Sequence, residues 1–416
     1  MGVSYRSGKD TSMSSTQRVP ANLAAMAVVW GATAYGYTNV GFSAALIVFC
    51  LYLLFDIYKN KRITVIQVPR CMGWGMGILY GGLFISTLFH LDHMKNLNGG
   101  YFSAVGFILY TLPLWMILYI GWKEDIRKAA GIMLYAILYA MCLYGIVRYF
   151  ALSETRLDSF YHFPTRIGMM LDMLIPVTAA YGYYYRKETL WKYGAVVLLV
   201  LEVVTLFLAR VRGSVMALAA AVLLAVLLWL VKNRHKLSGL VKAGVVGIVT
   251  LMIIFSAWYI IMLRSGNPFA EKGGERFMMW ESSYEMFVDH PVAGVGLNEW
   301  QQLYAEGKYH PAASTEIGQV MPHNVFIYFF ATGGLIGGVG YCLYVILMYA
   351  YLFRKVWSPS AGPFAWAMLF LFTAATVHGL VDQTFILKLT GRILYLLLGI
   401  GLLFEERYKD RRIRHT

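Results

Sequence analysis

Residues 213–231 form the apolar stretch GSVMALAAAVLLAVLLWLV, which is long enough to cross a membrane as a helix. Stretches of the same character recur from Ala21 to the C-terminus, with one long interruption at residues 263–322. Backbone polar groups inside lipid must bond within the chain, so helices are the expected spans. The sequence therefore predicts an all-α membrane protein with about twelve transmembrane helices.

The composition excludes a soluble domain. Of the 416 residues, 59% are hydrophobic and 14% are charged. The four cysteines lie in or at the edges of apolar stretches, so no disulfide framework or CxxC metal site is apparent. We expect the spans at residues 20–37, 39–58, 71–91, 101–122, 129–150, 166–185, 193–209, 213–231, 240–262, 323–353, 363–385 and 389–405.

Basic residues indicate the orientation of these spans. If the spans alternate, 24 of the 36 Lys and Arg residues fall on the side of the two termini. Because basic residues are enriched in cytoplasmic segments, we expect cytoplasmic tails at residues 1–19 and 406–416. The first tail lacks the pattern of a cleaved signal peptide. The net charge of +14 then faces anionic membrane lipid, and nucleic acid is not an expected partner.

The long interruption divides the chain. Residues 20–262 carry spans one to nine, residues 263–322 form a loop on the outward side, and residues 323–405 carry spans ten to twelve. Long loops with structure of their own are usually functional. Apolar residues recur at helical spacing from Phe277 to Val288, which predicts an amphipathic helix within the loop. A second short helix is expected from Asn298, a plausible N-cap, to about Glu306.

Two arginines lie at the outward end of the seventh span, against the usual distribution of basic residues. Arg210 and Arg212 could extend to outer headgroups, or they could bind a phosphate group through paired N–H donors. We favour the second interpretation and expect a diphosphate site at this corner. Arg276, at the start of the predicted loop helix, is by itself an ordinary loop arginine.

A His-Asn pair opens the tenth span. His323 and Asn324 follow Pro322 at a helix start, where unpaired backbone N–H groups concentrate. The positive helix end disfavours an imidazolium, so His323 should stay neutral and able to accept a proton. Either side chain could instead cap the helix. Position alone leaves both interpretations open.

Other ionisable residues lie in or near spans. His378 and Asp382 are four residues apart on one face of the eleventh span, and we interpret them as a structural pair rather than a catalytic one. Arg148, Arg166 and Asp172 could form a further buried pair. The sequence has no outward DxD, no HExxH and no GxxxxGK[ST] motif, so no metal or nucleotide cofactor is expected.

Several short motifs occur together in the second half of the chain. They are Arg276-x3-Trp280, His290-Pro291-x2-Gly294-Val295-Gly296, Pro322-His323-Asn324-x-Phe326 and Gly333-Gly334-x2-Gly337. In this order, and with Arg212-Gly213 at a short outer turn upstream, they resemble the C-terminal signature of O-antigen ligases and the related polymerases. The resemblance covers about Arg210 to Gly338, and the first half of the chain agrees only in hydropathy and span number.

This resemblance implies a metal-independent glycosyltransferase on the periplasmic face of the bacterial inner membrane. The donor would be a glycan on undecaprenyl diphosphate, and the acceptor would be lipid A-core, as in lipopolysaccharide biosynthesis. Polymerisation of repeat units and transfer of glycan to protein use the same donor and remain alternatives. A lipid-linked oligosaccharide transporter is less favoured, because the ionisable residues gather at one face rather than at the midplane of several spans.

The residues give this chemistry a physical account. Fixed arginines stabilise the charge that grows on a diphosphate leaving group, and Arg212 and Arg276 are the candidates, with Arg210 in reserve. His323 would take the proton of the attacking hydroxyl. The possible supporting residues are Asn324, His378 and Asp382. A single displacement would invert the anomeric centre.

Overall fold

The computed structural model describes most of the chain, namely residues 25–27, 29–30, 39–61, 66, 68–90, 95–98, 102–123, 125–161, 163–262, 274–305, 308–312, 314, 316 and 318–413. All regular elements in these ranges are helices, which confirms the all-α class. Eight helical stretches in these ranges are long and apolar enough to cross a membrane. The total of twelve spans stays a prediction, since most of the first expected span lies outside the described residues.

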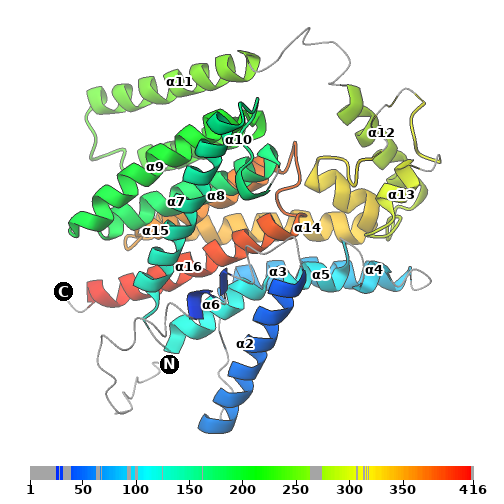
Figure 1. The fold of residues 1–416 in the computed structure, drawn as a ribbon, viewed down its shortest axis with the longest axis horizontal. Helices are drawn as coiled ribbons and strands as arrows, with labels where there is room; N and C mark the ends of the chain where they lie inside the picture. The colour runs from blue at the N-terminus through cyan, green and yellow to red at the C-terminus, as the bar shows by residue number, and fades with distance from the viewer. Residues whose placement is uncertain are drawn as a thin grey trace.

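The described helices follow the expected spans along most of the chain (Figure 1). Their bounds are α2 (Asn39–Asn60), α3 (Arg70–Leu88), α4 (Lys95–Asn98), α5 (Ala104–Leu109), α6 (Leu112–Lys123), α7 (Arg127–Ala151), α8 (Pro164–Tyr184), α9 (Thr189–Ala209), α10 (Arg212–Lys232), α11 (Gly239–Met262), α12 (Gly274–Asp289), α13 (Trp300–Ala305), α14 (Val325–Trp357), α15 (Pro363–His378) and α16 (Lys388–Ile413). A short 3-10 turn, Ser159–Tyr161, lies between α7 and α8.

The helices differ from the expected spans at three places, and one of these differences contradicts an expected bound. The fourth span, Ala104–Trp122, consists of two helices, α5 and α6, and α16 extends through residues 406–413. The eleventh span ends at His378 rather than at residue 385. The Thr384 hydroxyl donates to the Ala375 carbonyl at 2.7 Å, so a side chain takes up one of the carbonyls that the helix end leaves open.

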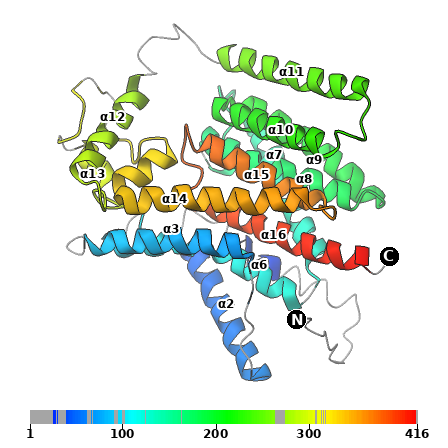
Figure 2. The ribbon, with the colours of Figure 1, turned by 180° about the vertical axis from the view of Figure 1, so that it is seen from behind.

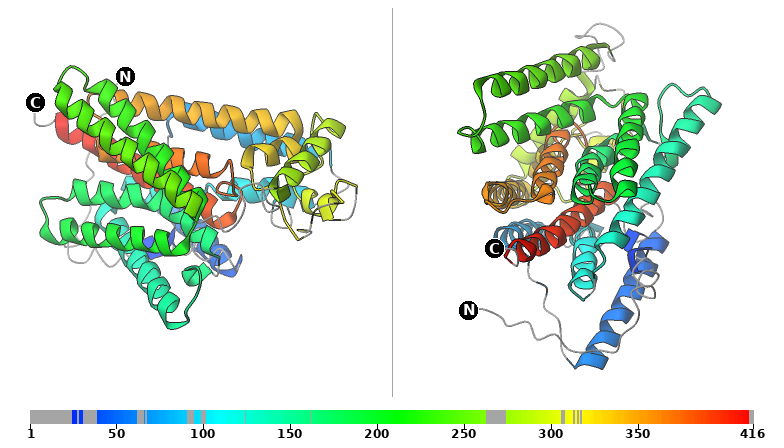
Figure 3. Two further views of the ribbon diagram at one scale, coloured as in Figure 1. Left: turned by 90° about the horizontal axis from the view of Figure 1, so that it is seen from above. Right: turned by 90° about the vertical axis from the view of Figure 1, so that its left-hand side faces the viewer.

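The helices form one bundle. α14 lies along α3, α15 packs against α8, α10, α14 and α16, and α11 packs on α10. Figure 2 shows α3 and α14 side by side, with α2 projecting away from the bundle, and Figure 3 shows the same pair from above. We call the end of the bundle that carries α12 and α13 the loop end. The connection between α15 and α16 lies on the side nearest α12 and α13 (Figure 1).

The two helices expected inside residues 263–322 are both present, as α12 and α13. α12 buries one face, including Met279 and Met286, and exposes Phe277 and Tyr284. The short helix begins at Trp300, after Asn298, whose side-chain oxygen accepts the Phe102 backbone N–H at 3.1 Å. The part of the loop that follows α12 is therefore tied to the segment before α5.

The tenth span is not the single straight helix that its hydropathy predicts. Gly334 has φ 60° and ψ −154°, and the chain changes direction there within α14. In a continuous helix, residues 330 and 338 would be about 12 Å apart along the axis. A Cβ placed on Gly338 would instead lie 2.3 Å from the Phe330 ring. The first nine residues of α14 thus fold back against the rest.

The backbone groups freed by this break are paired with the loop. The N–H groups of residues 335 and 336 donate to the carbonyls of Pro291 and Val292 at 2.8 and 3.2 Å. In return, the N–H groups of residues 295 and 296 donate to the carbonyls of Ala331 and Thr332, each at 3.0 Å. Irregular backbone at membrane depth is tolerated only where protein satisfies it in this way.

Glycine is required where the two backbones meet. Gly294 and Gly334 both have positive φ, a conformation that L side chains rarely adopt. A Cβ on Gly294 would lie 2.3 Å from the Thr332 carbonyl carbon, and one on Gly334 would lie 2.4 Å from the Val292 carbonyl. Two of the glycine motifs in the sequence therefore form one contact, which fixes the start of α14 relative to the loop.

Candidate functional site

A histidine and an aspartate meet at the loop end. The Nδ1 atom of His323 lies 3.3 Å from Oδ1 of Asp382, and the side chains are 18% and 7% exposed. The Nε2 atom of the same ring lies 2.9 Å from Oε1 of Gln319. His323 is thus the accessible member of the pair, and Asp382 is buried behind it.

Hydrogen bonds between the start of α14 and the segment after α15 bring His323 and Asp382 together. The Asn324 side chain accepts the Ile327 N–H at 3.1 Å and so caps α14. Of the two side chains that the sequence allowed as the cap, it is thus Asn324. The same side chain donates to the Leu380 carbonyl at 2.9 Å, and the Val325 N–H donates to the Gly379 carbonyl at 2.8 Å. The start of α14 is therefore joined to the loop that carries Asp382, and the His323 side chain is left for other contacts.

His378 has a partner that the sequence did not identify. Its Nδ1 atom forms a short hydrogen bond with Oδ2 of Asp172 on α8, and its Nε2 atom lies 4.0 Å from Oδ2 of Asp382. Asp172 and His378 are fully buried. Asp172 therefore does not pair with Arg148 or Arg166, as considered from the sequence. Arg148 instead contacts Glu154 and Asp158, each at 2.9 Å.

Arginines surround the turn between α9 and α10. Arg210 ends α9 in a left-handed conformation, and Arg212 is the first residue of α10. Arg156, which the sequence analysis did not single out, donates from Nε to the Ala209 carbonyl at 3.1 Å. Burial lowers the pKa of Arg156, and the charges of Arg212 and Arg210 lower it further, whereas Asp382 raises it. The guanidinium groups of Arg210 and Arg212 and the Asp382 carboxylate therefore each lie within electrostatic range of Arg156.

Arg276 reaches the same region from the loop. It lies in the first turn of α12, is exposed, and interacts electrostatically with both His378 and Asp382. The Trp280 indole, one turn further along α12, donates to the Pro322 carbonyl at 2.8 Å. The Arg-x3-Trp motif thus ties α12 to the residue before His323 and brings Arg276 within electrostatic range of Asp382.

The structure therefore gathers most of the residues expected from the sequence into one cluster. It adds Arg156 and Gln319, which lie in none of the sequence motifs, and it gives Asp172 a partner, His378, that is 206 positions away in the sequence. It also explains Arg212-Gly213, since a Cβ on Gly213 would lie 2.6 Å from His378 Nε2. Only glycine allows the start of α10 to pack this closely on the ring.

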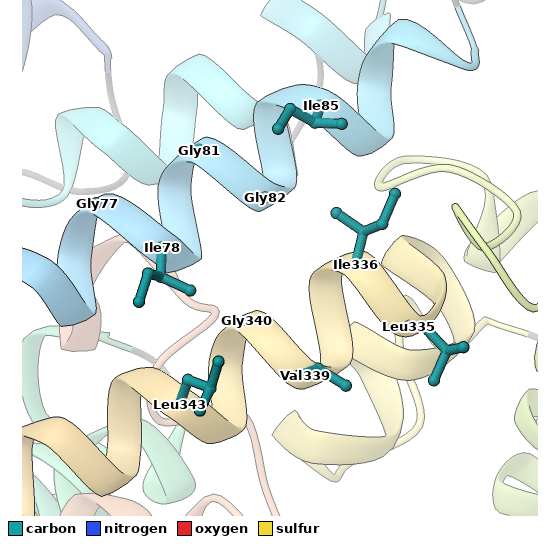
Figure 4. Close-up of a pocket in the computed structure, with 10 residues that line it drawn as sticks. All are labelled: Gly77, Ile78, Gly81, Gly82, Ile85, Leu335, Ile336, Val339, Gly340 and Leu343. Atoms are coloured by element: carbon teal, nitrogen blue, oxygen red, sulfur yellow. The ribbon is translucent and has the colours of Figure 1, made fainter.

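A separate groove lies between α3 and α14 (Figure 4). It has a volume of about 350 Å³, and its lining consists of glycines and aliphatic residues, namely Gly77, Ile78, Gly81, Gly82, Ile85, Leu335, Ile336, Val339, Gly340 and Leu343. None of the candidate residues lines it. The groove offers no acid, base or cation, so we do not assign the chemistry to it.

The side chains of the cluster do not form a conventional metal site. Within the described residues, no three His, Cys, Asp or Glu side chains gather in a way that could hold a metal ion. The cluster combines two imidazoles and two carboxylates with several guanidinium groups. This combination suits proton transfer and anion binding.

Residues 194–342 match the family model described as O-antigen ligase. The match runs from α9 into α14, so it contains the three arginines predicted from the sequence and His323. It confirms the resemblance to the O-antigen ligase and polymerase superfamily that the motifs indicate. No curated protein matches the chain. Asp172, His378 and Asp382 lie outside the matched range, and the fold brings them to it.

Proposed function

Proceeding from the O-antigen ligase match, we propose that this protein moves a glycan from undecaprenyl diphosphate to a hydroxyl of lipid A-core at the periplasmic face of the inner membrane. The observation that carries the proposal is the position of His323. Its ring is backed by Asp382, and this carboxylate interacts electrostatically with Arg156 and Arg276 at the loop end. A base and an anion site are the two elements that this transfer needs.

His323 acts as the base. Asp382 accepts the Nδ1–H of the ring, so the lone pair of Nε2 is available to the acceptor. An entering hydroxyl takes the place of Gln319 at this nitrogen. As its oxygen attacks the anomeric carbon, the proton passes to Nε2, and the bond between that carbon and the diphosphate oxygen breaks. The single displacement inverts the anomeric centre, and the proton leaves His323 with the released diphosphate or with solvent.

Arg212 and Arg276 bind the diphosphate. Negative charge grows on this leaving group as the bond breaks, and guanidinium groups held in place by the fold stabilise it without reorganisation. Arg212 is fixed by the start of α10, and Arg276 by α12. Arg210 and Arg156 strengthen the positive potential of the same corner. Reaching this site from the outer leaflet requires the loop end to face the periplasm. We propose this orientation together with cytoplasmic termini, as the distribution of basic residues predicts.

The fate of the glycan in a deletion strain separates ligation from polymerisation. If the protein is a ligase, we expect polymerised glycan to remain on the lipid carrier while lipid A-core carries none. A polymerase would leave single repeat units attached to core instead. The measurement is gel analysis of lipopolysaccharide together with extraction of the carrier lipid. Normal lipopolysaccharide in the deletion strain would contradict both activities, and loss of glycan from a surface protein alone would indicate transfer to protein.

Transfer by the purified protein should not depend on a divalent metal. Because arginines provide the positive charge around the leaving group, we expect full activity in excess EDTA, measured as glycan transferred to acceptor in detergent or liposomes. A rate that returns only when Mg²⁺ or Mn²⁺ is added would contradict this expectation. Glu275, Glu281 and Asp382 would then be the first carboxylates to test as ligands.

A further inference from the structure

We propose that Asp172 and His378 are positioning residues for His323, because together they keep Asp382 ionised and thereby hold the ring proton of His323 on Nδ1. This inference rests on the proposed transferase function. It adds two fully buried residues, from α8 and the end of α15, to a reaction whose other groups gather at the loop end.

The four side chains form a continuous line. Asp172 bonds to Nδ1 of His378, and Nε2 of the same ring lies 4.0 Å from Asp382. The other carboxylate oxygen of Asp382 lies 3.3 Å from Nδ1 of His323. Exposure rises along the line, from 0% for Asp172 to 18% for the His323 side chain. The line leads from the interior of the bundle to the ring that substrate can reach.

The burial of the pair Asp172 and His378 requires a physical explanation. Asp172 is enclosed by an apolar bundle, where a lone carboxylate would be neutralised and a well-packed apolar residue would cost less. The adjacent imidazole compensates for its charge if the ring carries both protons. Its Nδ1–H then bonds to Asp172, and the ring presents positive charge to Asp382. At 4.0 Å this second contact is too long for a direct hydrogen bond, so the two groups interact through charge.

The charge on Asp382 is what matters for His323. An ionised Asp382 accepts the Nδ1–H of His323, which leaves the lone pair on Nε2. In this tautomer the Gln319 side chain turns its amide NH2 group, rather than its oxygen, toward Nε2 until the proposed acceptor replaces it. A protonated Asp382 could not accept this bond, and the tautomer of His323 would no longer be fixed. Asp172 thus acts on His323 through two intervening groups.

Other charged groups face the same line. Arg276 of α12 interacts with His378 and Asp382, and Arg156 of the α7–α8 connection interacts with Asp382. Ser214 of α10 lies beside Asp172. Both arginines are present in every variant considered below, so their contribution is constant. A difference in pH dependence between the variants therefore reflects the loss of the Asp172–His378 pair.

The test is the pH dependence of transfer by Asp172→Asn. Without its carboxylate partner, the buried His378 ring becomes neutral, and Asp382 and His323 both lose a nearby positive charge. Each then binds its proton more tightly, so the acid limb of the kcat profile should move to higher pH by about one unit. The KM for the donor should change little. A purely structural role would lower activity at every pH and leave the limb in place.

Glu202→Gln is the matched control. Glu202 is also a fully buried carboxyl in this bundle, where it accepts a hydrogen bond from Thr178 at 3.0 Å. Changing it to an amide should leave the acid limb where it is. His378→Gln removes the same cation as Asp172→Asn, so it should shift the limb in the same direction. If Asp172 and His378 act as a unit, the double variant should shift it no further than either single variant.

A second readout separates this inference from the proposed function. The His323 ring signal in the NMR spectrum of histidine-labelled protein can be assigned by its loss in His323→Gln. The midpoint of the pH titration of this signal should rise by about one pH unit in Asp172→Asn or, if that variant does not fold, in His378→Gln. Absence of transfer by wild-type protein would contradict the proposed function alone. If the titration midpoint of His323 is unchanged in a folded variant, this inference is overturned, whatever the transfer activity.

Discussion

Replacing His323 by Asn should lower kcat by roughly 100- to 10,000-fold while donor binding remains nearly intact, because this is the usual contribution of a positioned general base. Asn suits the position for two reasons. It tolerates the left-handed backbone that His323 adopts, with φ 51°, and, being smaller than histidine, it fits the same space. The helix cap is also untouched, since Asn324 provides it. Loss of activity can therefore be attributed to loss of basicity.

The measurement is single-turnover transfer from a lipid-linked donor, with donor affinity determined separately. His290→Asn is the control, because His290 is exposed and lies in the same loop. It should behave like wild type. A folded His323→Asn protein with normal turnover would make His323 structural. His378 would then be the next candidate for the base, although its full burial makes direct contact with substrate difficult.

Hydropathy was sufficient to predict much of the bundle because each span has to satisfy its own backbone in lipid. It could not predict the break in α14. Residues 325–353 carry no charged side chain, and the only local signs of a break are the glycine pairs Gly333-Gly334 and Gly337-Gly338. The break is stable because residues 291–296, more than thirty positions upstream, supply the missing backbone partners. A local pattern carries no information about such a distant contact.

The candidate site, like the fold, could be predicted only in part from the sequence. The sequence placed Arg212, Arg276 and His323 among the candidates from their positions at helix ends and in motifs. It paired His378 with Asp382 on helical spacing, whereas the helix ends at His378 and the closer partner is Asp172. Asp382 turns instead toward His323. Pairing across helices depends on packing, so one sequence alone could not reveal it.

The second large effect is expected at the two arginines. Arg212→Lys and Arg276→Lys should each lower kcat/KM by about 30- to 1,000-fold, which corresponds to about 2 to 4 kcal/mol of transition-state stabilisation for one donor. Lysine keeps the positive charge but replaces a planar fork with a point charge, so it cannot make the paired contacts to a diphosphate. If the arginines supplied only a positive potential, the lysine variants would stay close to wild type.

Arg166→Lys is the matched control. Arg166 lies at the start of α8, with its guanidinium 4.2 Å from the centre of the Phe163 ring, and we assign it no part in donor binding. Its variant should retain nearly full kcat/KM in the same assay. Because Arg212 and Arg276 are proposed to contact one diphosphate, the double lysine variant should lose less than the sum of the two separate losses, expressed as free energies. Wild-type turnover in the double variant would exclude both arginines from the mechanism and leave the leaving group without a stabilising partner among the proposed residues.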